Sequence, residues 1–200
     1  MKIRLSLGGA IALAVLASCA TSAPESVYGR QNVASSAEIA EVQQNFSDAV
    51  VEACGEWFTS DLDIEARSAN TDLNLTQLRA GERWPGGIVT GMPVYRAADR
   101  VVHIKENLIG ASCEVAAYGP PAAVTFEQIA ERLTTAEKGF TEVNRDFDTA
   151  PGVTMRLFER QTGDIVVAIL LNGNEPGAGG SISRFSTLRA VTRYRSAAAE

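Results

Sequence analysis

The chain has 200 residues, and its 24 Asp and Glu residues outnumber its 18 Lys and Arg residues, which gives a net charge of −6 at pH 7. Hydrophobic residues make up 46% of the sequence, a share typical of a globular protein and too high for a disordered one. The acidic excess produces a long-range field of the wrong sign for nucleic acid and for anionic lipid headgroups, so nucleic acid is not an expected partner.

Residues 1–18 have the layout of a signal peptide. Lys2 and Arg4 form a short positive segment, and an uncharged stretch follows from Leu5 to Ser18. That stretch is shorter than the roughly 20 apolar residues that a membrane-spanning helix needs. Cleavage after residue 18 removes two basic residues and no acidic one, so the mature chain has 16 basic against 24 acidic residues, a net charge of −8.

The stretch ends in Leu16-Ala17-Ser18-Cys19, which resembles the lipobox of bacterial lipoproteins. The resemblance implies cleavage before Cys19 and attachment of a diacylglycerol to its thiol, usually joined by a third acyl chain such as palmitate. The residue after the cysteine, Ala20, is not the aspartate that commonly retains lipoproteins at the inner membrane, which in a Gram-negative host implies the outer membrane, facing the periplasm. The alternative is cleavage at Ser18-Cys19-Ala20 as an ordinary secretion site, which would release a soluble protein.

With Cys19 lipidated, Cys54 and Cys113 are the two remaining cysteines. An exported chain matures in an oxidising compartment, and an even cysteine count favours a disulfide between them. Closing a loop of about 60 residues would stabilise the fold by about 4 kcal/mol. Two separately buried thiols are the alternative. A redox centre is disfavoured because the sequence lacks a Cys-x-x-Cys motif.

Residues 19–35 are small and polar, and they are predicted to form a flexible tether that spans roughly 50 Å when extended. A capping box, Ser35-x-x-Glu38, then predicts the start of a helix that ends near Cys54-Gly55. Its apolar residues recur at helical spacing, which predicts a face packed on the core: Ile39, Val42, Phe46, Ala49, Val50 and Ala53.

Residues 56–92 show no clear periodicity, and their structure is left open. Beyond Pro93 the pattern predicts strands over 94–97, 101–105 and 111–118, followed by an amphipathic helix from Thr125-x-x-Gln128 to Lys138-Gly139. Further strands are predicted over 140–147, 153–160, 165–172 and 182–194. The segment 165–171 is apolar on both faces, which favours a central strand. Residues 197–200 are expected to fray.

Few helices and adjacent strands predict one α+β domain over residues 36–196, in which an antiparallel meander sheet carries one or two amphipathic helices on a face. This layout resembles small uncharacterised bacterial envelope lipoproteins, and the resemblance implies no activity.

The sequence offers few residues for catalysis. Its one histidine, His103, alternates with Lys105 in a predicted strand, and we expect both side chains to face solvent. One histidine excludes zinc sites built from several, whereas carboxylate-rich metal sites stay open. No Gly-x-Ser-x-Gly elbow is present. A nucleophilic pair of Cys113 with His103 is disfavoured, because export leaves Cys113 a disulfide partner in Cys54.

The acidic and glycine-rich segments also lack specific signatures. Asp61-Leu-Asp63 and Asp146-Phe-Asp148 do not have calcium-loop spacing and are predicted on the surface. Gly173–Gly180 lacks the Lys-Ser/Thr of a phosphate-binding loop and is predicted to be a mobile hairpin loop. We therefore expect no catalytic residue, no metal and no cofactor. Paired carboxylates for glycoside cleavage remain an alternative, because their separation depends on tertiary structure.

Two tryptophans stand in irregular segments, Trp57 beside Phe58 and Trp84 before Pro85-Gly86-Gly87. Exposed tryptophans often anchor a partner, so Trp57 and Trp84 are candidates for a binding face. The alternative is that both cover the core beneath long loops.

Together these features predict a membrane-anchored envelope lipoprotein that acts as a non-enzymatic binding or accessory module, with an envelope protein or a small ligand as its partner. A periplasm-facing hydrolase with an acidic site is the second hypothesis. A structural accessory subunit is a third, which the sequence does not separate from the first.

Overall fold

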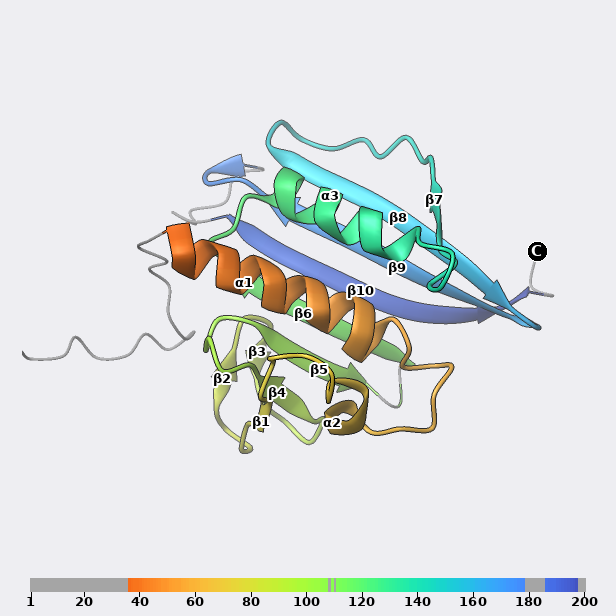
Figure 1. Ribbon diagram of the computed structural model, residues 1–200. Coiled ribbons are helices and arrows are strands. Elements are labelled where there is room, and N and C mark those ends of the chain that lie inside the picture. Colours follow the sequence, from red (N-terminus) through yellow and green to blue (C-terminus); the bar gives the residue numbers. More distant parts are fainter. Residues whose placement is uncertain (1–35, 108, 110, 179–185, 198–200) are drawn as a thin grey trace, which may run out of the picture.

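The computed structural model describes residues 36–107, 109, 111–178 and 186–197 (Figure 1). The lipobox, Cys19 and the predicted tether lie outside the described residues. Among the described residues, no helix is long and apolar enough to cross a membrane.

One eight-stranded sheet forms the centre of the fold, and all its neighbouring strands pair antiparallel. Two meanders, β4-β5-β6 and β7-β8-β9-β10, join side by side through β6 and β10. In spatial order the strands are β1 (Thr76–Gln77), β4 (Val94–Arg96), β5 (His103–Asn107), β6 (Ser112–Tyr118), β10 (Thr187–Ser196), β9 (Ile165–Asn174), β8 (Val153–Thr162) and β7 (Thr141–Val143).

Two amphipathic helices, α1 (Ser36–Asp48) and α3 (Ala122–Leu133), lie side by side on one face of this sheet (Figure 1). A six-residue π-helix, η1 (Ala49–Cys54), continues α1, and the short α2 (Ile64–Arg67) follows. Between helices and sheet lies the main core, in which Phe46, Phe126 and Phe158 are fully buried. The α+β prediction, with its antiparallel meander and helices on one face, is confirmed.

The first helix has the predicted apolar face, since Val42, Phe46 and Val50 are buried, and it ends at Cys54 as predicted. The wider π-helical turn was not predicted. Gly55 follows it, where a Cβ atom would lie 2.5 Å from the carbonyl oxygen of Val51, so only glycine fits without displacing the backbone. The predicted capping box begins at residue 35, outside the described residues.

The second helix begins at Ala122, three residues before the predicted start. Thr125 does not cap it, because its hydroxyl donates back to the carbonyl of Pro121 at 2.7 Å. The free N–H of Ala122 instead donates to the carboxylate of Glu175, which comes from beyond the end of β9. A carboxylate at a helix N-terminus is favoured by the helix dipole, and this long-range cap was invisible in the local sequence.

Strand β9 runs to Asn174, so Gly173 lies in the sheet and not in the predicted loop; residues 179–180 of that loop are outside the described residues. A Cβ atom at Gly173 would lie 2.3 Å from the Cβ of Ala122, so this glycine allows α3 to approach the sheet. The apolar strand 165–171 is interior, as expected, between β8 and β10. Strand β7 is shorter than the predicted 140–147.

A two-stranded hairpin, β2 (Arg83–Trp84) with β3 (Gly87–Ile88), packs on the sheet face opposite α1 and α3. Its Trp84 joins Leu78, Val89, Val94 and Ala116 in a second apolar cluster. Val94 and Ala116 pair with Lys105 and His103, whose side chains alternate with the core-facing Ile104. The segment 56–92, left open by the sequence, therefore supplies α2, β1 and this second layer.

Candidate functional site

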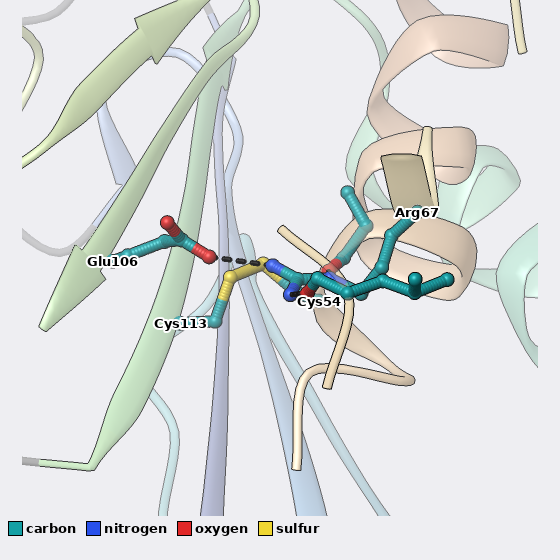
Figure 2. Close-up of a disulfide and its surroundings, with 6 residues drawn as sticks. Cys54, Arg67, Glu106 and Cys113 are labelled. Atoms are coloured by element: carbon teal, nitrogen blue, oxygen red, sulfur yellow. Dashed lines mark hydrogen bonds and ion pairs between the residues drawn. A yellow bond between two sulfur atoms is a disulfide. The ribbon is translucent and has the colours of Figure 1, made fainter. Parts of the chain in front are cut away.

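A disulfide joins Cys54, at the end of η1, to Cys113, in β6 (Figure 2). The two Cα atoms are 5.5 Å apart and both side chains are fully buried. The bond expected from the cysteine count is present, and it clamps the helix layer to the sheet. A thiol partner for His103 is therefore not available in the disulfide-bonded protein.

An ion pair lies beside the disulfide (Figure 2). Nη2 of Arg67 is 2.5 Å from Oε1 of Glu106, and their side chains are only 4% and 10% exposed. Arg67 also donates to the backbone carbonyls of Ala53 and Leu62. Since Glu106 pairs with Cys113 across β5 and β6, the ion pair and the disulfide hold the same junction of helix and sheet.

Trp57 is half-buried and packs against the main core. Its ring lies edge-on to Phe58 at 4.3 Å between centroids, and Phe58 lies in the same way 4.4 Å from Tyr194 on β10. Tyr194 is 45% exposed, so this aromatic row leads from the core to the surface at one end of β10.

Trp84 is 2% exposed, and this corrects the hypothesis that it presents an aromatic surface to a partner. Its ring is turned onto the sheet, where Lys105 lies 5.4 Å from the ring centroid. The tight turn depends on Gly86, since a Cβ atom there would lie 2.3 Å from the indole ring. Trp84 acts as the core residue of the hairpin.

His103 is 1% exposed, so the expectation that it faces solvent is wrong. It lies on the sheet face that the β2–β3 hairpin covers, and its Nδ1 is 3.0 Å from the carbonyl oxygen of Val101. Burial lowers its pKa from 6.5 to about 4, and Arg96 adds to this shift, while the hydrogen bond to Val101 and the charge of Asp99 oppose it. The imidazole is therefore neutral at pH 7.

The predicted surface acids do not converge. Asp61, Asp63, Asp146 and Asp148 are all exposed, and Asp63 caps α2 by accepting from the N–H of Ala66. No group of three or more His, Cys, Asp or Glu side chains with metal-binding geometry occurs among the described residues.

Three acids along α1, η1 and the following turn instead form a network with bases from α3, the turn after α3 and β8. Asp48 and Glu52 both pair with Arg132, and Glu52 and Glu56 both pair with Lys138. Arg160 reaches Glu56 at 3.2 Å. Burial alone would raise the pKa of Glu56, but the hydrogen bonds from Arg160 and Thr59, together with the charges of Arg160 and Lys138, outweigh it and place the pKa below its ordinary value. This network fastens the helices to the sheet.

We call the sheet face opposite α1 and α3, over β8, β9 and β10, the open face. Paired residues of antiparallel strands share a face, so Leu157, Leu170 and Val191 form one row across the three strands. With Ala168 they floor a groove of about 410 Å³. Leu157 is almost fully buried and the other three are half-buried.

Charged side chains surround this apolar groove. Arg193 and Arg195 line it from β10, Arg145 from the segment after β7, and Glu159 from β8. Arg195 lies 3.5 Å from Glu159. Arg145 and Arg193 are exposed, and neither makes an ion pair within the described parts of the chain. Three arginines against one glutamate make the groove locally cationic on a protein whose net charge is negative.

A second, smaller groove of about 200 Å³ borders the first on the same face. Its lining is polar and includes Asn172, Asn174, Thr187 and Arg189, and the hairpin residues Pro85 and Gly86 form a wall. Oδ1 of Asn172 is buried without a hydrogen-bond partner among the described residues. Along β9, the open face therefore changes from amide to aliphatic side chains within two residues.

Comparison with protein-family models, curated proteins and solved structures found no match to this chain.

Sequence reasoning placed the disulfide but missed the open face. The sequence signal that could have revealed this face is the alternation of side-chain directions along the last two strands. In β9 Ala168, Leu170 and Asn172 point one way, and in β10 Arg189, Val191 and Arg193 do the same. A reading of segment 165–171 as buried on both faces concealed this second surface.

Proposed function

We propose that this protein is a membrane-anchored lipoprotein of the cell envelope, held by lipid on Cys19, and that its domain is a non-enzymatic binding module. The apolar groove on the open face is the observation that carries the binding role. Its volume of about 410 Å³ falls in the range of small-molecule sites, which is about 300–1,000 Å³. The groove also combines an aliphatic floor with a few charged groups, as such sites do.

The anchor is supported by the lipobox at residues 16–19 and by the small, polar stretch that follows it. The disulfide between Cys54 and Cys113 agrees with this location, because structural disulfides persist mainly in oxidising compartments such as the periplasm. The position of Ala20 favours the outer membrane over the inner one under the sorting rule of bacterial lipoproteins.

A binding role is favoured over a hydrolase by the state of the carboxylates in the grooves. Glu159 in the apolar groove lies 3.5 Å from Arg195, and Glu114 in the polar groove lies 2.7 Å from Arg189. Each carboxylate thus has a guanidinium partner. A catalytic carboxyl must contact the substrate, whereas each of these carboxylates contacts a guanidinium group of the protein.

The mass of the mature protein tests the anchor. We expect the wild-type chain to begin at Cys19 and to exceed the mass of its peptide by a diacylglycerol and an acyl group. We expect Cys19→Ala to lack this mass and to leave the membrane fraction. An unmodified wild-type protein beginning at residue 21 would show ordinary secretion and overturn the proposal.

Membrane fractionation of Ala20→Asp tests the destination. The substitution introduces the aspartate that retains lipoproteins at the inner membrane, so it should move the protein from outer to inner membrane fractions in a Gram-negative host. Thr21→Asp is the matched control for the added charge and should leave the distribution unchanged. Wild type found in inner membrane fractions would contradict the outer-membrane assignment.

A further inference from the structure

The apolar floor of the open face is a strip that runs across three strands. Leu157, Leu170 and Val191 form its central row, and Ala168 widens it on β9. Neighbouring strands lie about 4.8 Å apart, so the central row spans roughly 10 Å. A strip of this length, one side chain wide, accommodates a segment of an extended acyl chain, and it is too narrow and too interrupted by polar neighbours to resemble the core of a folded domain.

The two borders of the strip differ. On one side the next row contains Asn172 and Arg189, and Arg189 is paired with Glu114. On the other side the next row contains Arg193, and Arg195 follows in the row beyond. The side of the strip with Arg193 and Arg195 therefore has a net positive charge, since Glu159 offsets only one of the two guanidinium groups.

We propose that the open face binds one acyl chain of a membrane phospholipid, with the chain on the aliphatic strip and the phosphate at Arg193 and Arg195. Burying the chain removes apolar surface of both partners from water. Guanidinium groups match phosphate oxygens through charge-assisted hydrogen bonds. The inference rests on the proposed function for its source of ligand, because a domain tethered to a membrane has phospholipid as its nearest amphiphile.

The local positive charge beside the strip favours an anionic headgroup although the net charge of the chain is negative. A mature chain of net charge −8 repels anions at long range, so an anionic ligand requires a local cationic surface. Arg193 supplies it without an acidic partner in the described ranges, and Arg145 lines the far end of the same groove. An acidic ligand without apolar groups would use the arginines but would leave the aliphatic strip exposed to water.

Photocrosslinking in cells tests the proposal on the full chain. Cells are fed a diazirine-bearing fatty acid, which they esterify into phospholipid, and are then irradiated. Purified protein is digested, and adducts are assigned by mass. We expect adducts of phospholipid mass on the peptides that contain Leu170 or Val191. Adducts of free fatty acid mass alone, or adducts spread evenly over exposed peptides, would overturn the proposal.

Two variants probe different parts of the site. Arg193→Glu reverses the charge at the phosphate position, and Ala168→Phe fills the strip without changing charge. Each should reduce adducts on β9 and β10 peptides about tenfold, the scale of one lost charge-assisted contact or a blocked site. Arg83→Glu is the matched control: it makes the same charge change at an exposed position on the β2–β3 hairpin and should leave the adducts unchanged. Equal labelling of all four proteins would refute the proposal.

The same digest separates this inference from the proposed function. An acylated peptide beginning at Cys19 reports the anchor, and adducts on β9 or β10 report the groove. Loss of the first with retention of the second would remove the anchor alone. Native mass spectrometry adds a second readout: a monomer with one bound phospholipid is expected, whereas a lipid-free dimer that dissociates in Arg193→Glu would show that the open face binds a second copy instead.

Discussion

Arg67 and Glu106 form a buried ion pair at the junction that the disulfide also spans. The two residues come from a short helix and from β5, 39 positions apart, and meet at 2.5 Å. The guanidinium has two further acceptors, the carbonyl oxygens of Ala53 and Leu62, so every partner of this buried cation comes from a different segment. The pair thus fixes the irregular connection after η1 against the sheet.

Glu106→Gln should destabilise the protein more than a typical surface substitution. It keeps the shape of the side chain but leaves Arg67 buried without a counter-ion, which costs about 3–5 kcal/mol. Urea denaturation followed by tryptophan fluorescence measures the loss. Arg67→Met with Glu106→Leu removes both charges and should recover part of it. A double variant that is less stable than Glu106→Gln would show that the hydrogen bonds of Arg67 to Ala53 and Leu62 outweigh the ion pair.

Removing the disulfide should lower the free energy of unfolding by about 4 kcal/mol, because it closes a loop with a sequence separation of 59 residues. The variant Cys54→Ala with Cys113→Ala measures this effect by denaturant unfolding, and treatment of wild type with a reductant should give a similar midpoint. A variant that matches oxidised wild type would mean that the bond adds no stability and that packing around the two cysteines holds the junction.

Local sequence patterns predicted the elements that rest on apolar periodicity. The face of α1 and the strands β5, β6, β8 and β9 followed from this signal, because each buries a regular set of side chains. The cysteine count likewise indicated the disulfide. What the sequence did not reveal depends on tertiary partners. Glu175 accepts a hydrogen bond from the first residue of α3, and the helix begins three residues before the predicted start. Trp84 is buried against strands that follow it in the chain.

The same limit explains why the candidate site was missed. Alternation predicts that His103 and Lys105 share a face, which is correct, but it does not say whether a separate hairpin covers that face. The β2–β3 hairpin covers it near His103 and reaches β9 and β10 only at the polar groove, so one side of the same sheet contains both a buried histidine and an apolar groove. Only the placement of residues 56–92 distinguishes these two regions.

The buried His103 should make stability fall as the pH falls through the weakly acidic range. Its pKa is about 4 in the folded protein against 6.5 for an ordinary histidine, so between these values the unfolded chain binds a proton that the native protein does not. The contribution of His103 to the free energy of unfolding is fully present above pH 6.5. It is lost progressively as the pH falls to about 4, by a total of about 3 kcal/mol.

His103→Asn tests this by removing the titrating group. Free energies of unfolding are measured from pH 7 to pH 4 for both proteins, and the difference between the two curves gives the contribution of residue 103. The variant is expected to start less stable at pH 7 and to lose about 3 kcal/mol less than wild type across the range. Parallel pH curves would contradict a depressed pKa for His103.

Gly173 sets the distance between α3 and the sheet, and this can be tested with one methyl group. Its backbone φ is not in the left-handed region, so Gly173→Ala introduces a packing effect and not a conformational one. The new Cβ would lie 2.3 Å from the Cβ of Ala122 and 3.0 Å from the ring of Phe126, and overpacking of this kind costs about 1–3 kcal/mol. The double-mutant cycle with Ala122→Gly tests which contact causes this cost, because that substitution removes the closer of the two contacts. The double variant should therefore lose less stability than the sum of the two single variants, measured by thermal unfolding. Strict additivity would mean that the two residues do not share a contact and that α3 sits farther from β9 than this packing requires.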